Sequence, residues 1–143
     1  MNDQLPIIAS EVPGGARLAF LPEYFGARYL MAGEAYFYHW ARSLSDDYDG
    51  GSWDYFTLSN GGFFVAPRVP AVLNIAVSGN YFTGEVSAQA FGIIIVLFVL
   101  SGLANSTVET DEDACERFSN LHHALLEFAR SHPERAAILG ATD

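Results

Sequence analysis

The sequence contains no lysine, and arginine supplies all seven of its basic side chains. Acidic residues number 17 among 143, which is close to the share that an ordinary globular protein carries. The net charge of −10 therefore comes from missing bases and not from surplus acids. A surface that imitates B-DNA would need about one negative charge per 1.7 Å of its axis, in long dense rows. The sequence has no such rows, so we do not expect it to copy a DNA duplex.

Runs of basic residues are missing as well. Proteins that bind nucleic acids neutralise phosphates with clustered cations, and proteins that bind anionic membranes do the same. Seven scattered arginines offer no such cluster. We therefore expect neither direct nucleic-acid binding nor attachment to a membrane.

Cysteine is nearly absent, and the single Cys115 cannot form a disulfide within the chain. One unpaired thiol is typical of a reducing cytoplasm. The N-terminal stretch MNDQLPIIASEVPGG has no basic segment followed by a long apolar core, so it does not match a signal peptide. We expect a cytoplasmic protein.

Long hydrophobic runs are limited to one stretch, FGIIIVLFVLSGLA at residues 91–104. As a helix this run would rise about 21 Å, which is short of the bilayer core of about 30 Å. It is apolar on nearly all sides, so we expect a central helix covered by the sheet and by other helices. Ser87 is its expected N-cap, and Asn105-Ser106 its expected end.

The first part of the chain suggests an arm followed by helices. Residues 1–15 are expected to form a flexible N-terminal arm ending at Pro13-Gly14-Gly15, with a single domain over residues 16–143. Residues 21–26 indicate one or two helical turns with glycine at the exit, and a longer helix is predicted from about residue 28 to 45.

The hydrophobic period then changes from helical spacing to alternation. Trp53, Tyr55 and Thr57 alternate with their neighbours in a strand pattern. Asn60-Gly61 predicts a hairpin with a type I′ turn, in which both central residues have positive φ. Returning strands complete a small antiparallel β-meander of three to four strands, at residues 63–66, 72–77 and 81–83.

The remainder of the chain is helical. Thr110 and Asp113 approximate a capping box that opens a helix through about Arg130, with an apolar face over Ala114, Phe118, Leu121, Leu125, Phe128 and Ala129. Pro133 begins a last short helix that Gly140 ends. The expected fold class is α+β, with the meander packed against several α-helices, one of them central and apolar.

Residue groups that could carry catalysis all have a simpler explanation. The acids between Glu109 and Glu116 suit the first turn of a helix, where they complement the helix dipole. Ser119, His123 and Glu127 share one helix face in triad-like order. Mid-helix N–H groups are already bonded, however, so no oxyanion hole adjoins this serine.

Metal and cofactor signatures are missing from the sequence. His39 and His132 have no second ligand at metal-binding spacing, and Cys115 and His122 are separated by about 10 Å of helix. No zinc motif, phosphate loop or dinucleotide fingerprint occurs. We therefore expect no catalysis, no cofactor and no metal.

The stretch YDGGSWDYFTLSNGGFFVAP at residues 48–67 resembles the signature region of the ArdB/KlcA antirestriction family, and of its KlcA-type members in particular. Other stretches agree in order and spacing: RLAFLPEYFGAR at 17–28, GEVSAQAFGIIIVLFVL at 84–100 and FARSHPERAAI at 128–138. The resemblance covers nearly the whole chain. It implies a compact single α/β domain, carried by plasmids and other mobile elements, that protects incoming DNA against type I restriction systems of the host.

From this resemblance we expect an antirestriction protein that binds the type I restriction enzyme or an associated host factor, as a monomer. The candidate contacts are exposed acids and loop residues beside the meander, together with a terminal acid on a tail expected to be mobile: Asp46, Asp47, Asp49, Trp53, Asp54 and Asp143. Trp53 also suits a core anchor. Two alternatives stay open, a small hydrolase-like enzyme that uses His123 or His39, and an acidic DNA mimic that blocks the restriction enzyme's DNA site.

Overall fold

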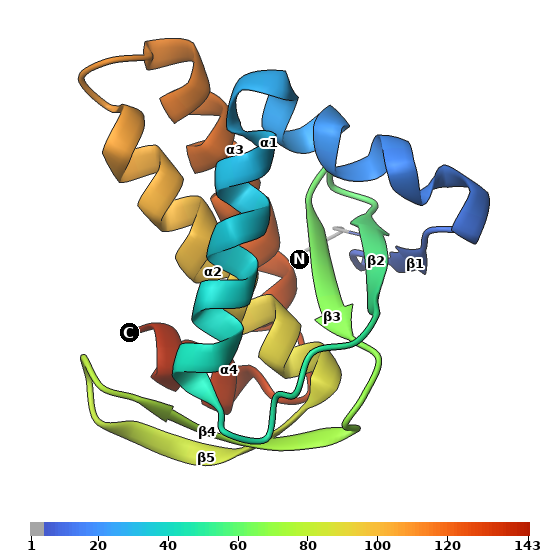
Figure 1. The fold of residues 1–143 in the computed structure, drawn as a ribbon, viewed down its shortest axis with the longest axis vertical. Coiled ribbons are helices and arrows are strands. Elements are labelled where there is room, and N and C mark those ends of the chain that lie inside the picture. Colours follow the sequence, from blue (N-terminus) through green and yellow to red (C-terminus); the bar gives the residue numbers. More distant parts are fainter. Residues whose placement is uncertain (1–4) are drawn as a thin grey trace.

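The computed structural model describes residues 5–143 and shows helices packed with two small antiparallel sheets (Figure 1). In chain order the elements are β1 (Ala9–Glu11), the 3-10 helix η1 (Gly14–Ala16), α1 (Arg17–Leu44), β2 (Trp53–Leu58), β3 (Phe63–Pro67), β4 (Val72–Val77), β5 (Phe82–Ser87), α2 (Ala88–Thr107), α3 (Glu112–Arg130) and α4 (Arg135–Thr142). The predicted α+β class is confirmed. In Figure 1 the β4–β5 hairpin lies at the lower end of the molecule, and the turn between α2 and α3 lies at the upper end.

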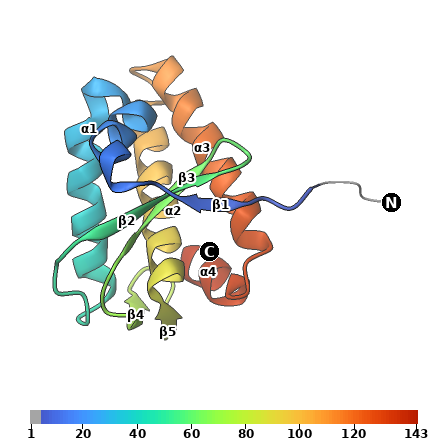
Figure 2. The same cartoon turned by 90° about the vertical axis from the view of Figure 1, so that its right-hand side faces the viewer.

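Helix α2 is the central apolar helix that the sequence predicts. Its 20 residues include no charged side chain, and every residue from Ala90 to Leu97 is buried. Eight consecutive residues cover all sides of a helix with 3.6 residues per turn. Helices α1, α3 and α4 and the strands β3, β4 and β5 therefore pack around it, and Figure 2 shows it between α1 and α3.

Both ends of α2 are held by hydroxyl groups. Ser87 is the N-cap, as predicted, and its hydroxyl oxygen accepts a hydrogen bond from the Ala90 N–H at 3.1 Å. The predicted break at Asn105-Ser106 is wrong, because the helix continues to Thr107. The Ser106 and Thr107 hydroxyls donate to the carbonyl oxygen of Leu103 at 3.1 and 2.7 Å, so these residues bond within the helix instead of ending it.

At its full length α2 is also long and apolar enough to cross a bilayer, which no other helix in residues 5–143 is. The sequence prediction counted only the 14 residues 91–104, whereas the helix has 20 residues. In the fold, 67% of the most hydrophobic 18-residue window is buried by the surrounding elements. The hydrophobicity of α2 is therefore used for packing inside the domain.

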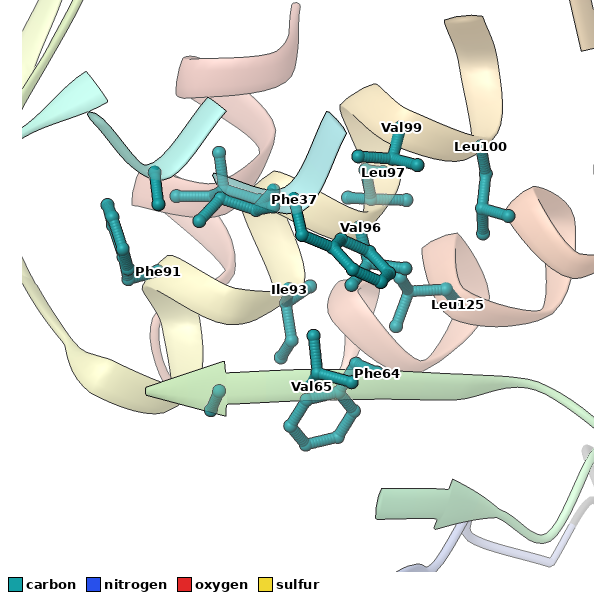
Figure 3. Packing of buried hydrophobic residues seen from close by; sticks show 14 of the residues in the cluster. Phe37, Phe64, Val65, Phe91, Ile93, Val96, Leu97, Val99, Leu100 and Leu125 are labelled. Carbon is teal, nitrogen blue, oxygen red and sulfur yellow. The ribbon is translucent and has the colours of Figure 1, made fainter. Parts of the chain in front are cut away.

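The backbones of α2 and β3 approach each other very closely at Gly92. A Cβ added at Gly92 would lie 1.9 Å from the carbonyl oxygen of Val65 and 2.7 Å from Cα of Ala66. Only a hydrogen atom fits there, so the two backbones touch with no side chain between them. Figure 3 shows Val65 of β3 facing Ile93 of α2 within the surrounding cluster of buried side chains.

The first sheet has the order β1-β2-β3, and its β2–β3 hairpin confirms the turn predicted at Asn60-Gly61. The turn is not type I′, however. The Leu58 N–H donates to the Gly62 carbonyl oxygen at 2.9 Å, and Gly61 alone in this loop has positive φ, at 92°. These features define a three-residue loop with a left-handed glycine. Asn60 is held by a long-range contact instead, since its amide donates to the Ala124 carbonyl oxygen of α3 at 2.9 Å.

The strands expected in one meander are divided between two sheets. β4 occupies the predicted residues and pairs with β5 from Val72↔Ser87 to Val77↔Phe82, whereas β3 and β4 do not pair. Pro67 and Pro70 frame the connection between β3 and β4, and neither has an N–H group to donate to a ladder. β5 extends further than predicted because β4 supplies partners along its whole length.

Helix α1 consists of two parts that meet at Gly26, as the sequence predicts, although the first part already begins at Arg17. Gly26 has φ 75° and ψ 161°, which interrupts the helical hydrogen bonds. The carbonyl oxygen of Phe25 accepts a hydrogen bond from the Arg117 guanidinium at 3.0 Å. The kink is thus fixed by α3, a contact 92 residues away in the sequence.

The ends of α3 and α4 differ from the sequence prediction. The N-cap of α3 is Asp111 and not Thr110, because the Asp111 carboxylate accepts from the Ala114 N–H at 3.1 Å and from the Tyr29 hydroxyl at 2.7 Å. α4 continues past Gly140, where the Thr142 hydroxyl donates to the Ile138 carbonyl oxygen at 2.8 Å. The predicted apolar face of α3 is confirmed, with four of its residues buried and two partly buried: Ala114, Phe118, Leu125 and Ala129, then Leu121 and Phe128.

The later part of the expected N-terminal arm, from Ile8 to Val12, is bonded to the domain. Residues 1–4 lie outside the described part of the chain. Beyond them, β1 pairs with β2 as an edge strand, and the Val12 N–H donates to the Tyr55 carbonyl oxygen at 2.7 Å. The Val12 side chain is buried. A three-residue strand carries too little hydrophobic pattern to be predicted from local sequence.

We expect Gly92→Ala to lower the free energy of unfolding by roughly 2–4 kcal/mol, since the added methyl group overlaps backbone atoms of β3. Urea denaturation followed by circular dichroism measures this change. Gly102→Ala in the same helix is the matched control, because an added Cβ there meets no atom within 4 Å. That variant should gain up to about 1 kcal/mol of stability. Equal effects of the two changes would contradict the contact.

Candidate functional site

The six predicted contact residues lie in three different surroundings. Asp46, Asp47 and Asp49 belong to the loop between α1 and β2, Trp53 and Asp54 begin β2, and Asp143 follows α4. Each surrounding determines what its residues can offer a partner.

Trp53 is a core residue. Its side chain is 8% exposed, and its indole N–H donates to the Tyr48 hydroxyl at 3.1 Å. The Tyr38 ring meets the indole edge to face, with ring centres 6.2 Å apart. Trp53 therefore anchors the start of β2, in line with the second explanation given from the sequence, and presents little surface to a partner.

Asp54 is neutralised within the protein. Its carboxylate forms ion pairs with Arg17 at 2.8 Å and with Arg68 at 2.7 Å. The hydrogen bond from Arg68, reinforced by the bond and charge of Arg17, holds the pKa of Asp54 below its ordinary value despite partial burial. Neither arginine was identified from the sequence, because Arg17 is 37 residues away and no local pattern links it to Asp54.

The loop after α1 is fastened to strand β4. The Ser45 hydroxyl donates to the Asn74 carbonyl oxygen at 2.6 Å, and the Asp47 carboxylate accepts from the Asn74 N–H at 2.8 Å. Gly50 and Gly51 follow with φ of 91° and 97°, and they turn the chain into β2. Their positive φ explains this glycine pair without a ligand.

Asp46 and Asp49 remain available to a partner. Both side chains are exposed, and neither has a hydrogen-bond or ion-pair partner among the residues that the structure describes. They differ in this respect from Asp47, whose Oδ2 is bonded to Asn74, and from Asp54.

Three adjoining hollows form one groove along the open edge of β4, which we call the β4 groove. The first hollow lies beside Val69 and Pro70, the second beside Asn74, and the third beside Trp40 and Phe98. Asp47 lines both the first and the second hollow. The second and the third hollow have three lining residues in common, Ser43, Leu44 and Ala76. Each hollow has a volume of about 370–380 Å³ and is open to solvent, so the row suits an extended chain better than an enclosed small molecule. The groove is lined by residues 43–47, Asp49, Gly50, Gly51, Val69, Pro70, residues 74–80, Trp40, Phe98 and Asp143.

Asp143 lies at the far end of the β4 groove and is held there by β-hairpin residue Asn80. The Asn80 amide donates to the main-chain oxygens of Gly140, Ala141 and Asp143 at 3.2, 2.9 and 3.1 Å. The expectation of a mobile tail is therefore wrong. These three hydrogen bonds hold the last residues against the β4–β5 turn. Four of the six predicted residues, Asp46, Asp47, Asp49 and Asp143, thus line one groove.

The histidines do not assemble a catalytic site. His39 and His123 are exposed, and the one polar partner of His123 among residues 5–143 is Glu127, at 3.4 Å. His132 is buried: its Nδ1 accepts from the Glu134 N–H at 3.0 Å and its Nε2 lies 2.7 Å from Oε1 of Gln89. Burial lowers the pKa of His132, which keeps the ring neutral. Among residues 5–143, no three acidic, histidine or cysteine side chains gather closely enough to hold a metal ion.

Comparisons with known proteins agree with one another. Residues 46–143 match the family model described as "Antirestriction protein". The chain is 48% identical over 144 residues to antirestriction protein KlcA of Escherichia coli, with both chains covered completely. It is 32% identical over 128 residues to the putative antirestriction protein YubI of Escherichia coli K12, with 89% of each chain covered.

A solved structure matches the whole fold. It superposes with a TM-score of 0.89 and 46% identity over the full length of both chains. That structure comes from the KlcA and ArdB proteins, which show a novel fold and antirestriction activity against type I DNA restriction systems in vivo but not in vitro.

We expect Asp54→Asn to lower the free energy of unfolding at neutral pH by about 1 kcal/mol or less, because its ion pairs are partly exposed. The pKa of Asp54 is lower in the folded state than in the unfolded state, so the ion pairs stabilise the fold above the ordinary carboxyl pKa. This stabilisation is lost as the pH falls through the lowered pKa. Chemical denaturation at several pH values between neutrality and strong acid should therefore show the difference shrinking in acid. Asp46→Asn, which has no partner to lose, should match the wild type throughout, and a pH-independent loss in Asp54→Asn would contradict the ion pairs.

Proposed function

This chain belongs to the antirestriction protein family, and on that basis we propose that it alleviates type I restriction in the cell by binding a protein, without catalysis. The observation that carries the proposal is the match to the KlcA and ArdB structure over the full length of both chains, at 46% identity and a TM-score of 0.89. The match of residues 46–143 to the family model supports the same function.

The direct partner in this proposal is a host factor associated with the restriction system. The KlcA and ArdB proteins act in vivo but not in vitro. A component that is present in the cell and missing from a purified reaction accounts for that difference. Binding to the restriction enzyme alone would be expected to act in both settings.

A binding role is favoured over a hydrolase by the position of the histidines. His39 and His123 lie exposed on helix surfaces, and neither of them lines any of the three hollows. A general base needs a substrate held within hydrogen-bond reach, and an open helix surface does not hold one. The proposal therefore includes no cofactor, no metal and no reaction step.

The proposed contact surface is the β4 groove, where four of the predicted residues lie together. Asp46 and Asp49 are unpaired at one side of it, and Asp143 closes the far end. The proposal further places the protein in the cytoplasm as a monomer encoded by a mobile element, and the single free Cys115 is compatible with a reducing compartment. Direct binding to nucleic acid is not part of it, because the chain has seven arginines and no lysine.

The function is tested by the plating efficiency of unmodified phage on a host with a type I restriction system and on an isogenic host without one. Expression of this chain should raise plating only on the restricting host. Equal plating with and without the chain would refute the proposed function.

The contact surface is tested by the triple variant Asp46→Asn, Asp49→Asn, Asp143→Asn, which should lose at least tenfold of the protection. The matched control is Glu109→Gln, Glu112→Gln, Glu116→Gln, which makes the same change in net charge at exposed acids of the α2–α3 turn and the start of α3. That turn lies at the upper end of Figure 1. This control should protect like the wild type. Circular dichroism confirms that both variants fold, and full protection by the groove variant would exclude the groove.

A further inference from the structure

The β4 groove runs along a sheet edge with no neighbouring strand. β4 pairs with β5 on one side only, and residues 43–47 line the other side. The lining of the groove starts at Val69 and Pro70 and continues at residues 74–80, so it includes β4 from Asn74 to Val77. Those four strand residues span about 13 Å. With a hollow beyond each end of them, the groove suits an extended segment of about six to eight residues.

Apolar side chains lie at both ends of the groove. At one end Trp40 stacks on Phe98, with ring centres 4.3 Å apart and an angle of 7° between the rings, and Leu44 and Val77 line the same hollow. At the other end Val69 is 61% exposed. The apolar hollow at the Trp40 end and the exposed Val69 at the other end favour a partner segment that brings apolar side chains of its own.

The middle of the β4 edge is closed to a continuous ladder. Both backbone groups of Asn74 are taken, its carbonyl oxygen by the Ser45 hydroxyl and its N–H by the Asp47 carboxylate. An incoming segment therefore cannot pair with β4 as a full additional strand. It has to be held mainly by its side chains, so their charge and size determine which segment fits.

The charge of the groove selects a basic segment. Asp46, Asp49 and Asp143 contribute three carboxylates with no ion-pair partner among the described residues, and no arginine or histidine lines any of the three hollows. Among the described residues, Asp54 and Asp111 are the acids with arginine partners, Arg17 and Arg68 for Asp54 and Arg28 for Asp111. A negative groove in a protein of net charge −10 attracts cations and repels acidic chains.

We propose that the β4 groove binds an extended basic segment of a partner protein, with arginine or lysine side chains beside Asp46, Asp49 and Asp143 and an apolar side chain in the hollow of Trp40 and Phe98. This inference rests on the proposed function, because it gives the chemistry of the partner that the antirestriction activity would use. It also applies to the purified protein by itself, so it can be tested without a restriction assay.

The test uses a fluorescein-labelled eight-residue peptide in which arginine alternates with leucine, and fluorescence anisotropy measures its binding to the full chain. We expect saturable binding that weakens as salt rises from 50 to 300 mM, because screening reduces the attraction between opposite charges. A peptide with glutamate in place of arginine should not bind. Absence of saturable binding by the arginine peptide would overturn the inference.

The location of binding is tested with the two triple variants. The groove variant Asp46→Asn, Asp49→Asn, Asp143→Asn should bind the peptide at least tenfold more weakly, whereas the control Glu109→Gln, Glu112→Gln, Glu116→Gln should bind like the wild type. Equal weakening in both variants would mean attraction by net charge alone and would overturn the site. Amide chemical shifts of the folded wild-type protein should change on peptide addition along residues 43–51 and 72–80, and changes confined to α3 would also overturn it.

Failure of this inference is distinguishable from failure of the proposed function. If the wild-type protein protects phage DNA but binds no basic peptide, the proposed function stands and the basic-segment site is refuted. If it binds the peptide in the groove but gives no protection, the proposed function is refuted and the binding site stands.

Discussion

A helix without a polar face has to be covered on every side, and α2 imposes that requirement on the rest of the chain. One side is taken by β3, whose backbone touches the helix at Gly92 with no side chain between them. Helices α1, α3 and α4 and the β4–β5 hairpin take the others. β3 is consequently buried along all five residues and can carry no surface site. Polar chemistry is left to the periphery, on the loop after α1, the open edge of β4 and the outer face of α3.

Features that depend on local chemistry could be predicted from the sequence. The Ser87 cap, the Asn60-Gly61 hairpin, the bounds of β4 and the break at Gly26 follow from residue types and short spacings. Features that depend on distant partners could not. Asp111 becomes the cap of α3 because Tyr29 supplies a second donor, and the hairpin loop takes its form with Asn60 bonded to Ala124. The strands divide into two sheets at the connection framed by Pro67 and Pro70, neither of which has an N–H group to donate.

In the candidate site, too, local features could be predicted from the sequence and features that depend on distant residues could not. Its acids could be selected from the sequence as exposed loop residues, but their grouping could not. Asp143 joins Asp46 and Asp49 along one groove because Asn80 binds the main chain of the last residues. Asp54, only a few residues from Asp49, is removed from the set because Arg17 and Arg68 neutralise it. The antirestriction family model covers residues 46–143, so it includes all of these acids but not Arg17.

The contacts of Ser45 and Asp47 with Asn74 also affect how copies of this protein behave toward each other. A bare strand edge is a template on which the same edge of a second molecule can pair, and sheets can then grow from molecule to molecule. Here the central peptide of β4 is already bonded within its own chain, and the acids beside it repel an identical, equally negative edge. The loop that forms the groove thus also protects the protein from aggregating through β4 at high concentration.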